Sequence, residues 1–480
     1  NLAPLFVLPW RYSAMVWPIA GVAVLIWAIR SRLASVILFA FGLQLVSGVA
    51  HLHARSGGDV VPLVSPDSVS FLNNGFIGPV VIFMASLLSA RIVHRDLDKQ
   101  FTGELLGWVG LVWAGIWWMF AWQSELTRVT PELHLTAAFT AVTVVTMWLM
   151  RLLGDRLGWF QLLKSTVVYL PLLIIIALDA SPWRGSHPMA GWSAVTWPLA
   201  LVVHGFLLQW QKPILEDRFL KTAHVVGAWL FILLATLEVR WWFTQWSDPS
   251  SAWPLLGTVL VPVLYIWALT CKSTQISWPV REFHKSYVVV SAIPIIAYLA
   301  VWLWSSNLTS NGNAQPLPYV PLLNPLELVY FATMLSGIAW WRTVRSGVGG
   351  VDMDRFARLV FFVTGFALLT GGIIRACHHW ADIPWQFEAL MASYTVQTSL
   401  SIAWGLLAIS LMLLGNRRSL RSIWFTGGTL VAVVVGKLFL VELSASGTLQ
   451  RIVSFRVVGL LLLLIAYIAP LPPRADGRKN

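Results

Sequence analysis

The chain has 480 residues, of which 57% are hydrophobic and only 11% are charged. This composition excludes a soluble globular protein, because so few polar residues cannot cover a core of this size, and it predicts a polytopic membrane protein. The formal net charge is +12, but in a membrane protein basic residues first report the orientation of the loops. We therefore do not expect a nucleic-acid partner.

Apolar stretches recur along the whole chain, each about 17 to 25 residues long, the length that a helix needs to cross about 30 Å of hydrocarbon. Their residues do not alternate as those of barrel strands do, so we predict an all-α polytopic transmembrane helical bundle with about 15 spans. The predicted spans are residues 12–29, 33–50, 75–90, 105–122, 135–150, 162–178, 192–208, 222–237, 253–270, 287–304, 325–341, 356–374, 398–414, 423–441 and 453–469.

The connections between these spans alternate in charge. Those that follow odd-numbered spans, together with the C-terminal tail, hold 24 of the 33 Lys and Arg residues. The positive-inside rule therefore predicts that these connections and the C-terminus are cytoplasmic and that the N-terminus is outside. A chain that begins with Asn1 and has no signal peptide has no evident way to place this end outside. We therefore expect the numbered chain to be a piece of a longer protein.

Tryptophan gathers near the predicted outer ends of the spans. Such a belt of aromatic rings is expected at a membrane interface, and a binding platform built from the same rings is the alternative. A weak recurrence accompanies it, because Glu or Arg lies close to Trp at the outer ends of several even-numbered spans, which suggests repeated helix pairs. The residues concerned are Trp117, Trp118, Trp122, Glu125, Arg128, Glu238, Arg240, Trp241, Trp242, Trp246, Trp253, Arg375 and Trp380.

Several stretches carry a resemblance to a known family. They are FLNNGFIG at 71–78, YVPLLNPLEL at 319–328, IIRACHHW at 373–380, SIAWGLLAISLMLLGNRR at 401–418 and VVVGKLFLVELSASGTLQRIVSFRVVGLLLLLIAYIAPLPP at 433–473. The chain resembles the bacterial DUF2339 family of large predicted inner-membrane proteins. The resemblance implies a multi-pass protein of the bacterial inner (cytoplasmic) membrane, usually longer than this chain, and it implies no reaction.

The resemblance is specific over the C-terminal region and looser elsewhere. We therefore distinguish residues 1–314 from residues 315–480 and expect the two parts to form one continuous membrane domain. The positions that match the family's motifs are Asn324, Arg375, His378, His379, Trp380, Lys437, Glu442, Arg451 and Arg456.

Four basic residues and one acid suggest a candidate site at the outer end of the last helices. Lys437 lies in an apolar span near its outer end, and an ammonium group in hydrocarbon needs a partner such as Glu442. Arg451 and Arg456 begin the next predicted helix, and Arg375 ends an earlier one. This set is either an ion-pair network that fixes the helices or a cationic pocket for a phosphate or carboxylate group.

Two adjacent histidines extend the candidate site. His378 and His379 follow Arg375 by three and four residues, so on a continued helix both rings lie near the guanidinium group. They diverge by about 100° around the helix, and we find no further ligands at metal-binding spacing, so we predict neither a metal site nor a cofactor. The alternatives are an interfacial hydrogen-bonding role and a part in acid–base chemistry or phosphate binding.

Other polar residues give weaker signals. Asp59 or Asp67, in the first long outer loop, could act as the base of a membrane glycosyltransferase. His204 and His224 are expected to be packed within or beside spans rather than to relay protons. The two cysteines, Cys271 and Cys377, fall on opposite sides of the predicted bilayer, so no disulfide joins them.

Three hypotheses for function follow. The first is a non-enzymatic membrane protein that binds or translocates an anionic, lipid- or glycan-linked envelope component at its outer face. The second is a membrane transferase or ligase that uses polyprenyl-linked substrates, with His378 or His379 assisting an outer carboxylate. The third is a scaffold of an envelope complex. Membrane lipids are expected partners, further subunits or a homo-oligomer are possible, and enzymatic activity stays open.

Overall fold

The computed structural model describes residues 9–58, 64, 68–97, 101–180, 187–272, 275–348 and 350–437, together with residues 456, 459, 460 and 463. Within these ranges the chain is helical and contains no strand, which confirms the predicted fold class. The chain divides into two compact units: unit 1 comprises residues 1–239 and 273–292, and unit 2 comprises residues 240–272 and 293–480. The division into residues 1–314 and 315–480 stays a prediction.

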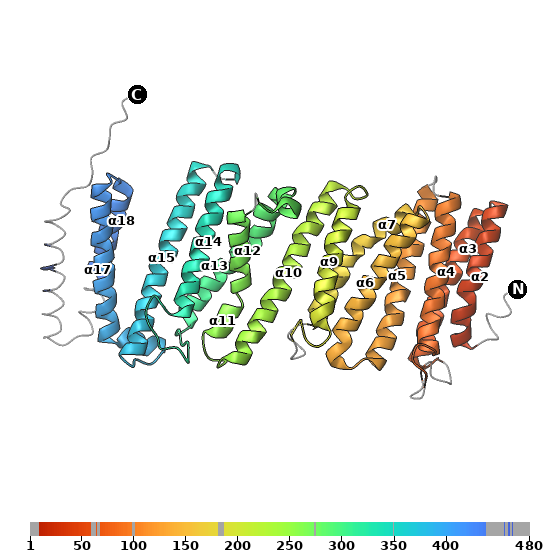
Figure 1. Ribbon diagram of the computed structural model, residues 1–480, viewed down its shortest axis with the longest axis horizontal. Coiled ribbons are helices and arrows are strands. Elements are labelled where there is room, and N and C mark those ends of the chain that lie inside the picture. The colour runs from red at the N-terminus through yellow and green to blue at the C-terminus, as the bar shows by residue number, and fades with distance from the viewer. Residues whose placement is uncertain are drawn as a thin grey trace, which may run out of the picture. The chain divides into compact units, whose positions relative to one another are not determined.

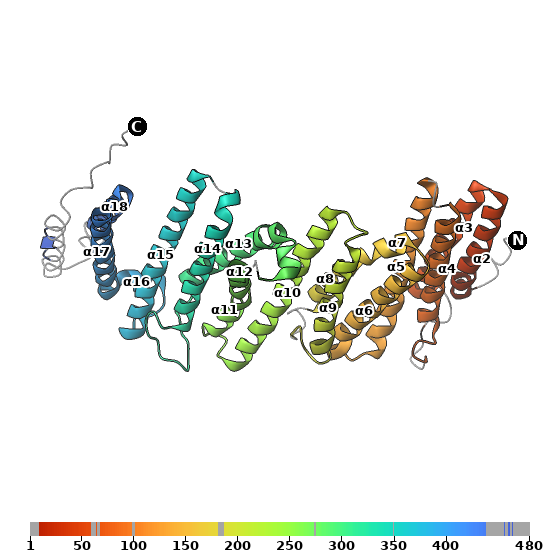
Figure 2. The ribbon, with the colours of Figure 1, turned by 45° about the horizontal axis from the view of Figure 1, so that its top comes forward.

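Unit 1 consists mainly of long helices that lie side by side (Figures 1 and 2). Its α6, α8, α9 and α10 enclose an apolar core around Tyr169, Leu173 and Trp197. The elements are α2 (Trp10–Ser31), α3 (Ala34–His53), η1 (Ala54–Gly58), α4 (Asn74–Leu97), α5 (Phe101–Val129), α6 (Glu132–Arg156), α7 (Phe160–Ser165), η2 (Thr166–Val168), α8 (Tyr169–Ala180), α9 (Ser193–Gln211), most of α10 (Asp217–Trp246), η4 (Ser277–Arg281) and η5 (Ser286–Ser291).

Unit 2 contains the end of α10, then α11 and α12, and the helices that follow η5. The short α16 lies between α15 and α17 in the chain and is labelled in Figure 2. The remaining elements are α11 (Trp253–Gly257), α12 (Leu260–Lys272), α13 (Ala292–Thr309), α14 (Pro325–Val348), α15 (Val351–Trp380), α16 (Phe387–Ala392), α17 (Tyr394–Arg417) and α18 (Arg421–Lys437).

Twelve helices of the described chain are long and apolar enough to cross a membrane, and they coincide with twelve of the predicted spans. The predicted spans 325–341 and 423–441 correspond to α14 and α18, which are helical but not among the twelve, and most of 453–469 lies outside the described residues. The protein is therefore a multi-pass membrane protein. The number of spans and their orientation stay predictions, and we use "outer" and "inner" for the predicted sides.

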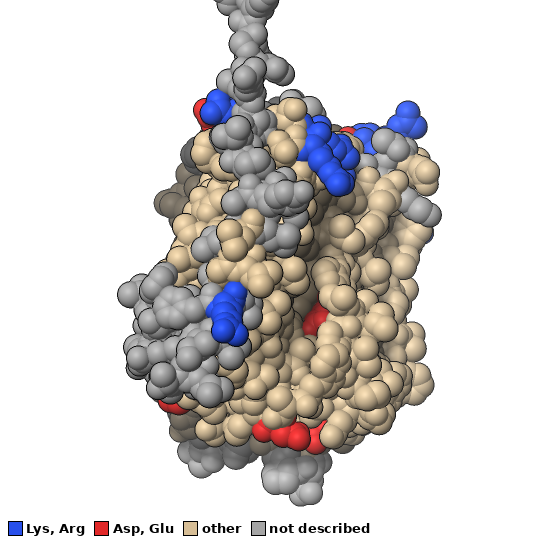
Figure 3. All heavy atoms as spheres, turned by 90° about the vertical axis from the view of Figure 1, so that its left-hand side faces the viewer, with Lys and Arg blue, Asp and Glu red and all other residues tan. Residues whose placement is uncertain are grey.

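Charged side chains lie at the ends of the helices. Figure 3 shows one end of unit 2, where Lys and Arg lie mostly at the upper edge, Asp and Glu lie mostly at the lower edge, and the surface between them is largely uncharged apart from a basic and an acidic side chain. This separation is expected of a body whose middle faces lipid. Both cysteines are free: Cys271 is exposed and Cys377 is buried.

Candidate functional site

Arg375, near the outer end of α15, is one of the most deeply buried side chains of the described chain, with 1% of its surface exposed. Its Nε lies 3.3 Å from Glu327 Oε1 of α14. Its Nη1 lies 3.1 Å from Asn307 Oδ1 of α13, and the guanidinium carbon lies 5.3 Å from the centre of the Tyr330 ring. A charge so deeply buried requires such partners, because an unpaired one costs several kcal/mol.

Glu327 connects this arginine to the loop before α14. Its Oε1 accepts a hydrogen bond from the Tyr319 hydroxyl at 2.6 Å, and its Oε2 accepts one from the backbone N–H of Leu322 at 2.6 Å. Burial, and then the hydrogen bond and the negative charge of Glu327, raise the pKa of Tyr319 well above its ordinary value. The phenol therefore stays protonated and remains a donor at neutral pH.

The loop between α13 and α14 closes over the pair. Asn324 caps α14 by accepting from Leu326 N at 2.9 Å, while its amide nitrogen donates to Gly312 O at 2.9 Å. Gly312 has a φ of +76°, and a Cβ there would lie 2.9 Å from Arg375 Cδ. Only glycine satisfies both the backbone conformation and this close approach.

The two histidines bind backbone carbonyl groups. His379 Nε2 lies 2.9 Å from Asn311 O, and its ring stacks on Tyr319 with centroids 4.3 Å apart. His378 Nδ1 lies 2.5 Å from Ile383 O, on the chain that follows α15. Each ring therefore holds a loop against α15. The functional roles of the two histidines stay predictions.

The other residues of the predicted site lie on later segments of the chain. Lys437, at the end of α18, donates to Gln397 O at 2.9 Å and to Ser401 Oγ at 2.8 Å, both on α17. Arg456 is exposed. Glu442 and Arg451 lie outside the described residues, as do Asp59 and Asp67 of the first outer loop. Among the described residues no group of His, Cys, Asp and Glu could hold a metal ion.

Two further outer glutamates repeat the arrangement of Glu327. Glu125 of α5, which is buried, accepts from the backbone N–H of Phe71 and the Asn73 amide, both at 2.9 Å, and pairs with Arg128. Glu238 of α10 accepts from the backbone N–H of Met189 at 3.0 Å and lies 2.8 Å from His187 Nδ1. In all three cases a helix carboxylate binds one backbone N–H of an outer loop and one cationic or titratable side chain.

A family model described as "Predicted membrane protein (DUF2339)" matches residues 6–472. The chain belongs to this family. The match covers nearly the whole chain, so it includes Glu125 and Glu238 as well as the C-terminal motifs. A search of curated proteins gives no match, and a search of solved structures gives none. The description of the family names no reaction.

Unit 2 also has a shallow outer cleft. Part of its lining belongs to the loop that carries Tyr319 of the Arg375 network. It has a volume of about 610 Å³ and is lined by Gln245, Trp246, Ser247, Asp248, Gln315 and Pro316. The two segments that form it are joined, because Ala252 N donates to Asn313 O at 2.7 Å and Trp253 Nε1 to Gln315 O at 3.0 Å. Hydrogen bonds from Ser250 lower the pKa of Asp248, so this carboxylate is ionised at neutral pH.

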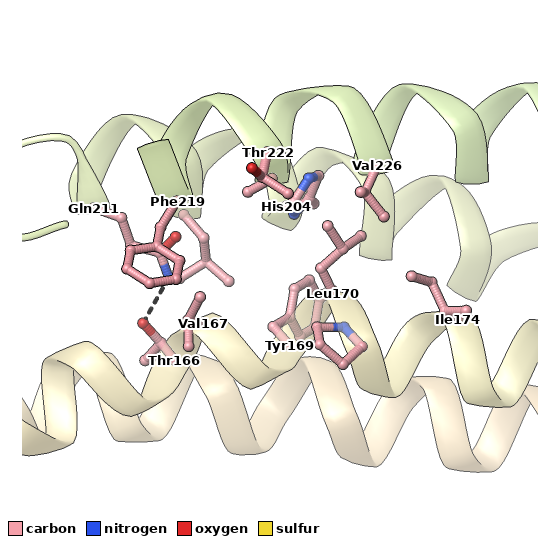
Figure 4. A pocket seen from close by; sticks show the side chains of 13 residues that line it. Thr166, Val167, Tyr169, Leu170, Ile174, His204, Gln211, Phe219, Thr222 and Val226 are labelled. Carbon is pink, nitrogen blue, oxygen red and sulfur yellow. Dashed lines mark hydrogen bonds between the residues drawn. The ribbon is translucent and has the colours of Figure 1, made fainter. Parts of the chain in front are cut away.

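His204 lies in a second pocket, within unit 1 (Figure 4). This pocket of about 180 Å³ is mostly apolar and lies among η2, α8, α9 and α10, and Gln211 donates to Thr166 Oγ1 at 2.8 Å at one end of it. His204 Nε2 is buried without a hydrogen-bond partner, and a Cβ on Gly227 would lie 2.4 Å from it. His224 lies instead against Phe283 and 3.0 Å from the Tyr287 hydroxyl. Both histidines are packed, as the sequence suggested.

Sequence reasoning identified Arg375 and both histidines but missed Glu327, Tyr319 and Asn307 as their partners. The sequence does contain a sign that Glu327 matters. It belongs to the family stretch at 319–328, in which Asn324-Pro325 is a pattern typical of a helix start. It was overlooked because 48 residues separate Glu327 from Arg375, and helix pairing is not visible in a single sequence.

Proposed function

We propose that the protein binds a glycan-bearing component of the cell envelope at the outer face of unit 2, in the cleft beside Trp246. The observation that carries this proposal is the position of a 76% exposed indole next to the ionised Asp248 and two exposed amides, Gln245 and Gln315. The cleft is a depression of one face, so we propose binding rather than passage across the membrane.

The lining suits a sugar ring. An indole offers a flat apolar surface for the C–H face of a pyranose, and its bulk dominates the contact area of such sites. A carboxylate accepts hydrogen bonds from two neighbouring hydroxyl groups, and an amide both donates and accepts. A few polar groups that converge beside an aromatic surface are a common composition for small-ligand sites.

The Arg375 network supports the cleft by fixing one of its walls. Gln315 belongs to the same loop as Gly312, Tyr319 and Leu322, and this loop is bound to α14 and α15 by the contacts of Glu327 and Arg375. A ligand then loses less free energy to the ordering of its site, since the loop is already held. Arg375 acts here as a positioning residue.

This proposal retains one part of the first sequence hypothesis and revises another. A glycan at the outer face is kept. The anionic character rested on four basic residues, Arg375, Lys437, Arg451 and Arg456, and the guanidinium group of Arg375 is buried against Glu327. Of the other three cationic candidates, Lys437 and Arg456 lie on other segments of unit 2, and Arg451 lies outside the described residues. A transferase would need a base, and the two loop carboxylates suggested for that role are outside the described residues.

The test uses the full chain in detergent and an array of bacterial surface glycans, followed by titration of any retained glycan. We expect Trp246→Ala and Asp248→Asn each to weaken binding by at least about tenfold, since a stacked ring or a charged hydrogen bond contributes about 1.4 kcal/mol or more. Trp192→Ala is the matched control, because Trp192 is also an exposed outer tryptophan, at 66%, but does not line the cleft.

Two results would overturn the proposal. One is that the unmodified protein retains no glycan on the array. The other is that Trp246→Ala binds as the unmodified protein does, or that Trp192→Ala weakens binding equally, either of which assigns Trp246 to the interfacial belt. Because the pKa of Asp248 is lowered, binding should be constant from about pH 5 to 8 and fall only below the ordinary carboxyl range.

A further inference from the structure

A crevice opens between α13, α14 and α15, on the inner half of unit 2. It has a volume of about 330 Å³, and its lining is almost entirely apolar. Leu303 of α13, Gly337 and Trp341 of α14, and Phe356 and Val360 of α15 contribute to it. Phe356 and Val360 are exposed as well as lining, so the crevice is open at the side of the helix group rather than enclosed.

The inner end of the crevice carries a cluster of charge. Trp341 Nε1 donates to Asp354 Oδ1 at 2.9 Å, and Arg358 Nη1 donates to Asp354 Oδ2 at 2.7 Å. Arg345 is close enough for its charge to act on the same carboxylate. Arg342 and Arg355 add two further exposed positive charges. Four arginines against Asp352 and Asp354 leave this end of α14 and α15 with a net charge of +2.

The length of the crevice agrees with one leaflet. From Arg345 to Thr333, which lines the crevice, α14 rises about 18 Å. Half of a hydrocarbon core of about 30 Å is about 15 Å. An acyl chain that starts at the level of the arginines therefore extends along the crevice to about the middle of the bilayer. Gly337 lies along this path, and a Cβ there would already lie 3.3 Å from Phe361 Cε1.

We propose that this crevice is a specific site for an anionic glycerophospholipid of the inner leaflet, with one acyl chain between α13, α14 and α15 and its phosphodiester group beside Arg342 and Arg345. Arginine suits a phosphate group because its planar fork donates two parallel hydrogen bonds. Basic pockets between membrane helices on the cytoplasmic side have the charge to select such lipids. The site is separate from the outer cleft and does not depend on a glycan ligand.

The test is native mass spectrometry of the delipidated full chain in detergent, titrated with phosphatidylglycerol or with phosphatidylcholine of the same acyl chains. We expect the unmodified protein to retain phosphatidylglycerol at least about tenfold more tightly, because two charge-assisted contacts distinguish the lipids. Arg342→Gln with Arg345→Gln should abolish this preference. Arg417→Gln with Arg418→Gln, an equal change of charge at the end of α17, should preserve it.

Gly337→Leu tests the binding of the acyl chain separately from the binding of the headgroup. Its side chain fills the crevice, so retention of both lipids should fall although every arginine remains. Equal retention of the two lipids by the unmodified protein would overturn the proposal, and this comparison needs no variant to fold. So would a Gly337→Leu protein that melts normally and binds phosphatidylglycerol as before, or an equal loss of preference in the Arg417/Arg418 control.

Discussion

Arg375 and Glu327 are 48 residues apart in the sequence, yet the Arg375 Nε atom lies 3.3 Å from Glu327 Oε1 and both side chains are almost completely buried. The pair joins α15 to α14, and through Tyr319 and Leu322 it also holds the loop before α14. A buried ion pair contributes little net stability compared with apolar residues of the same shape, but breaking it is costly. Removing one partner should therefore cost far more free energy than the intact pair contributes.

Glu327→Gln should destabilise the protein strongly. The amide cannot neutralise Arg375, so a buried guanidinium group is left without a counter-charge, at a cost of about 3 to 5 kcal/mol. Thermal unfolding in detergent measures this loss. Glu388→Gln, which changes an exposed acid of α16, is the control and should change the melting temperature little. The double change Glu327→Gln with Arg375→Met should recover part of the lost stability, and no recovery would contradict the pairing.

Glu125→Gln should loosen the segment before α4. Glu125 binds the Phe71 N–H and the Asn73 amide and pairs with Arg128, and a neutral amide replaces these charge-assisted bonds by weaker ones. Hydrogen exchange should then become faster at residues 68–76 and stay unchanged in α6. Glu132→Gln, an exposed acid at the start of α6, should leave exchange at 68–76 unaltered. Equal exchange in both variants would show that Glu125 does not hold this segment.

Much of this fold could be predicted from the sequence. In lipid the backbone hydrogen bonds must be made within the helix, and an apolar stretch long enough to cross the bilayer indicates such a helix. The predicted spans 75–90, 192–208 and 398–414 begin and end within a few residues of α4, α9 and α17, except at the C-terminal end of α4. Breaks within spans were not predicted: residues 162–178 contain the junction of α7, η2 and α8, and residues 253–270 contain a break between α11 and α12. Such breaks depend on local packing, which hydropathy does not report.

The candidate site was harder to predict for the same reason. That Arg375 requires a partner followed from its charge, but the sequence favoured Lys437, Glu442, Arg451 and Arg456 as neighbours because they lie in the family's C-terminal stretch. The helix that carries the described acidic partner is α14. The order in which helices pack is set by many weak contacts between them, and a single sequence contains no record of which helices meet.

Gly227→Ala should destabilise unit 1 because of His204. The added methyl group would lie 2.4 Å from His204 Nε2 in the buried packing between α9 and α10, and overpacking of this kind costs about 1 to 3 kcal/mol. Gly115→Ala in α5, where nothing lies within 4 Å of the new Cβ, is the matched control and should cause no loss of stability, because alanine is the better helix former. Thermal unfolding compares the two. If His204→Ala does not rescue Gly227→Ala, the loss has another cause than this contact.

The predicted orientation can be tested with two single cysteines. Ser250 lies in the connection between α10 and α11, and Ser419 lies between α17 and α18. Ser419 is flanked by Arg417, Arg418 and Arg421, whereas Ser250 lies near Asp248. After Cys271→Ser and Cys377→Ser, a membrane-impermeant maleimide applied to intact spheroplasts should label Ser250→Cys, while Ser419→Cys should react only after the membrane is permeabilised. The reverse pattern would place the glycan cleft on the cytoplasmic side and remove the basis for a glycan ligand of the envelope, because the positive-inside rule would then have failed for unit 2.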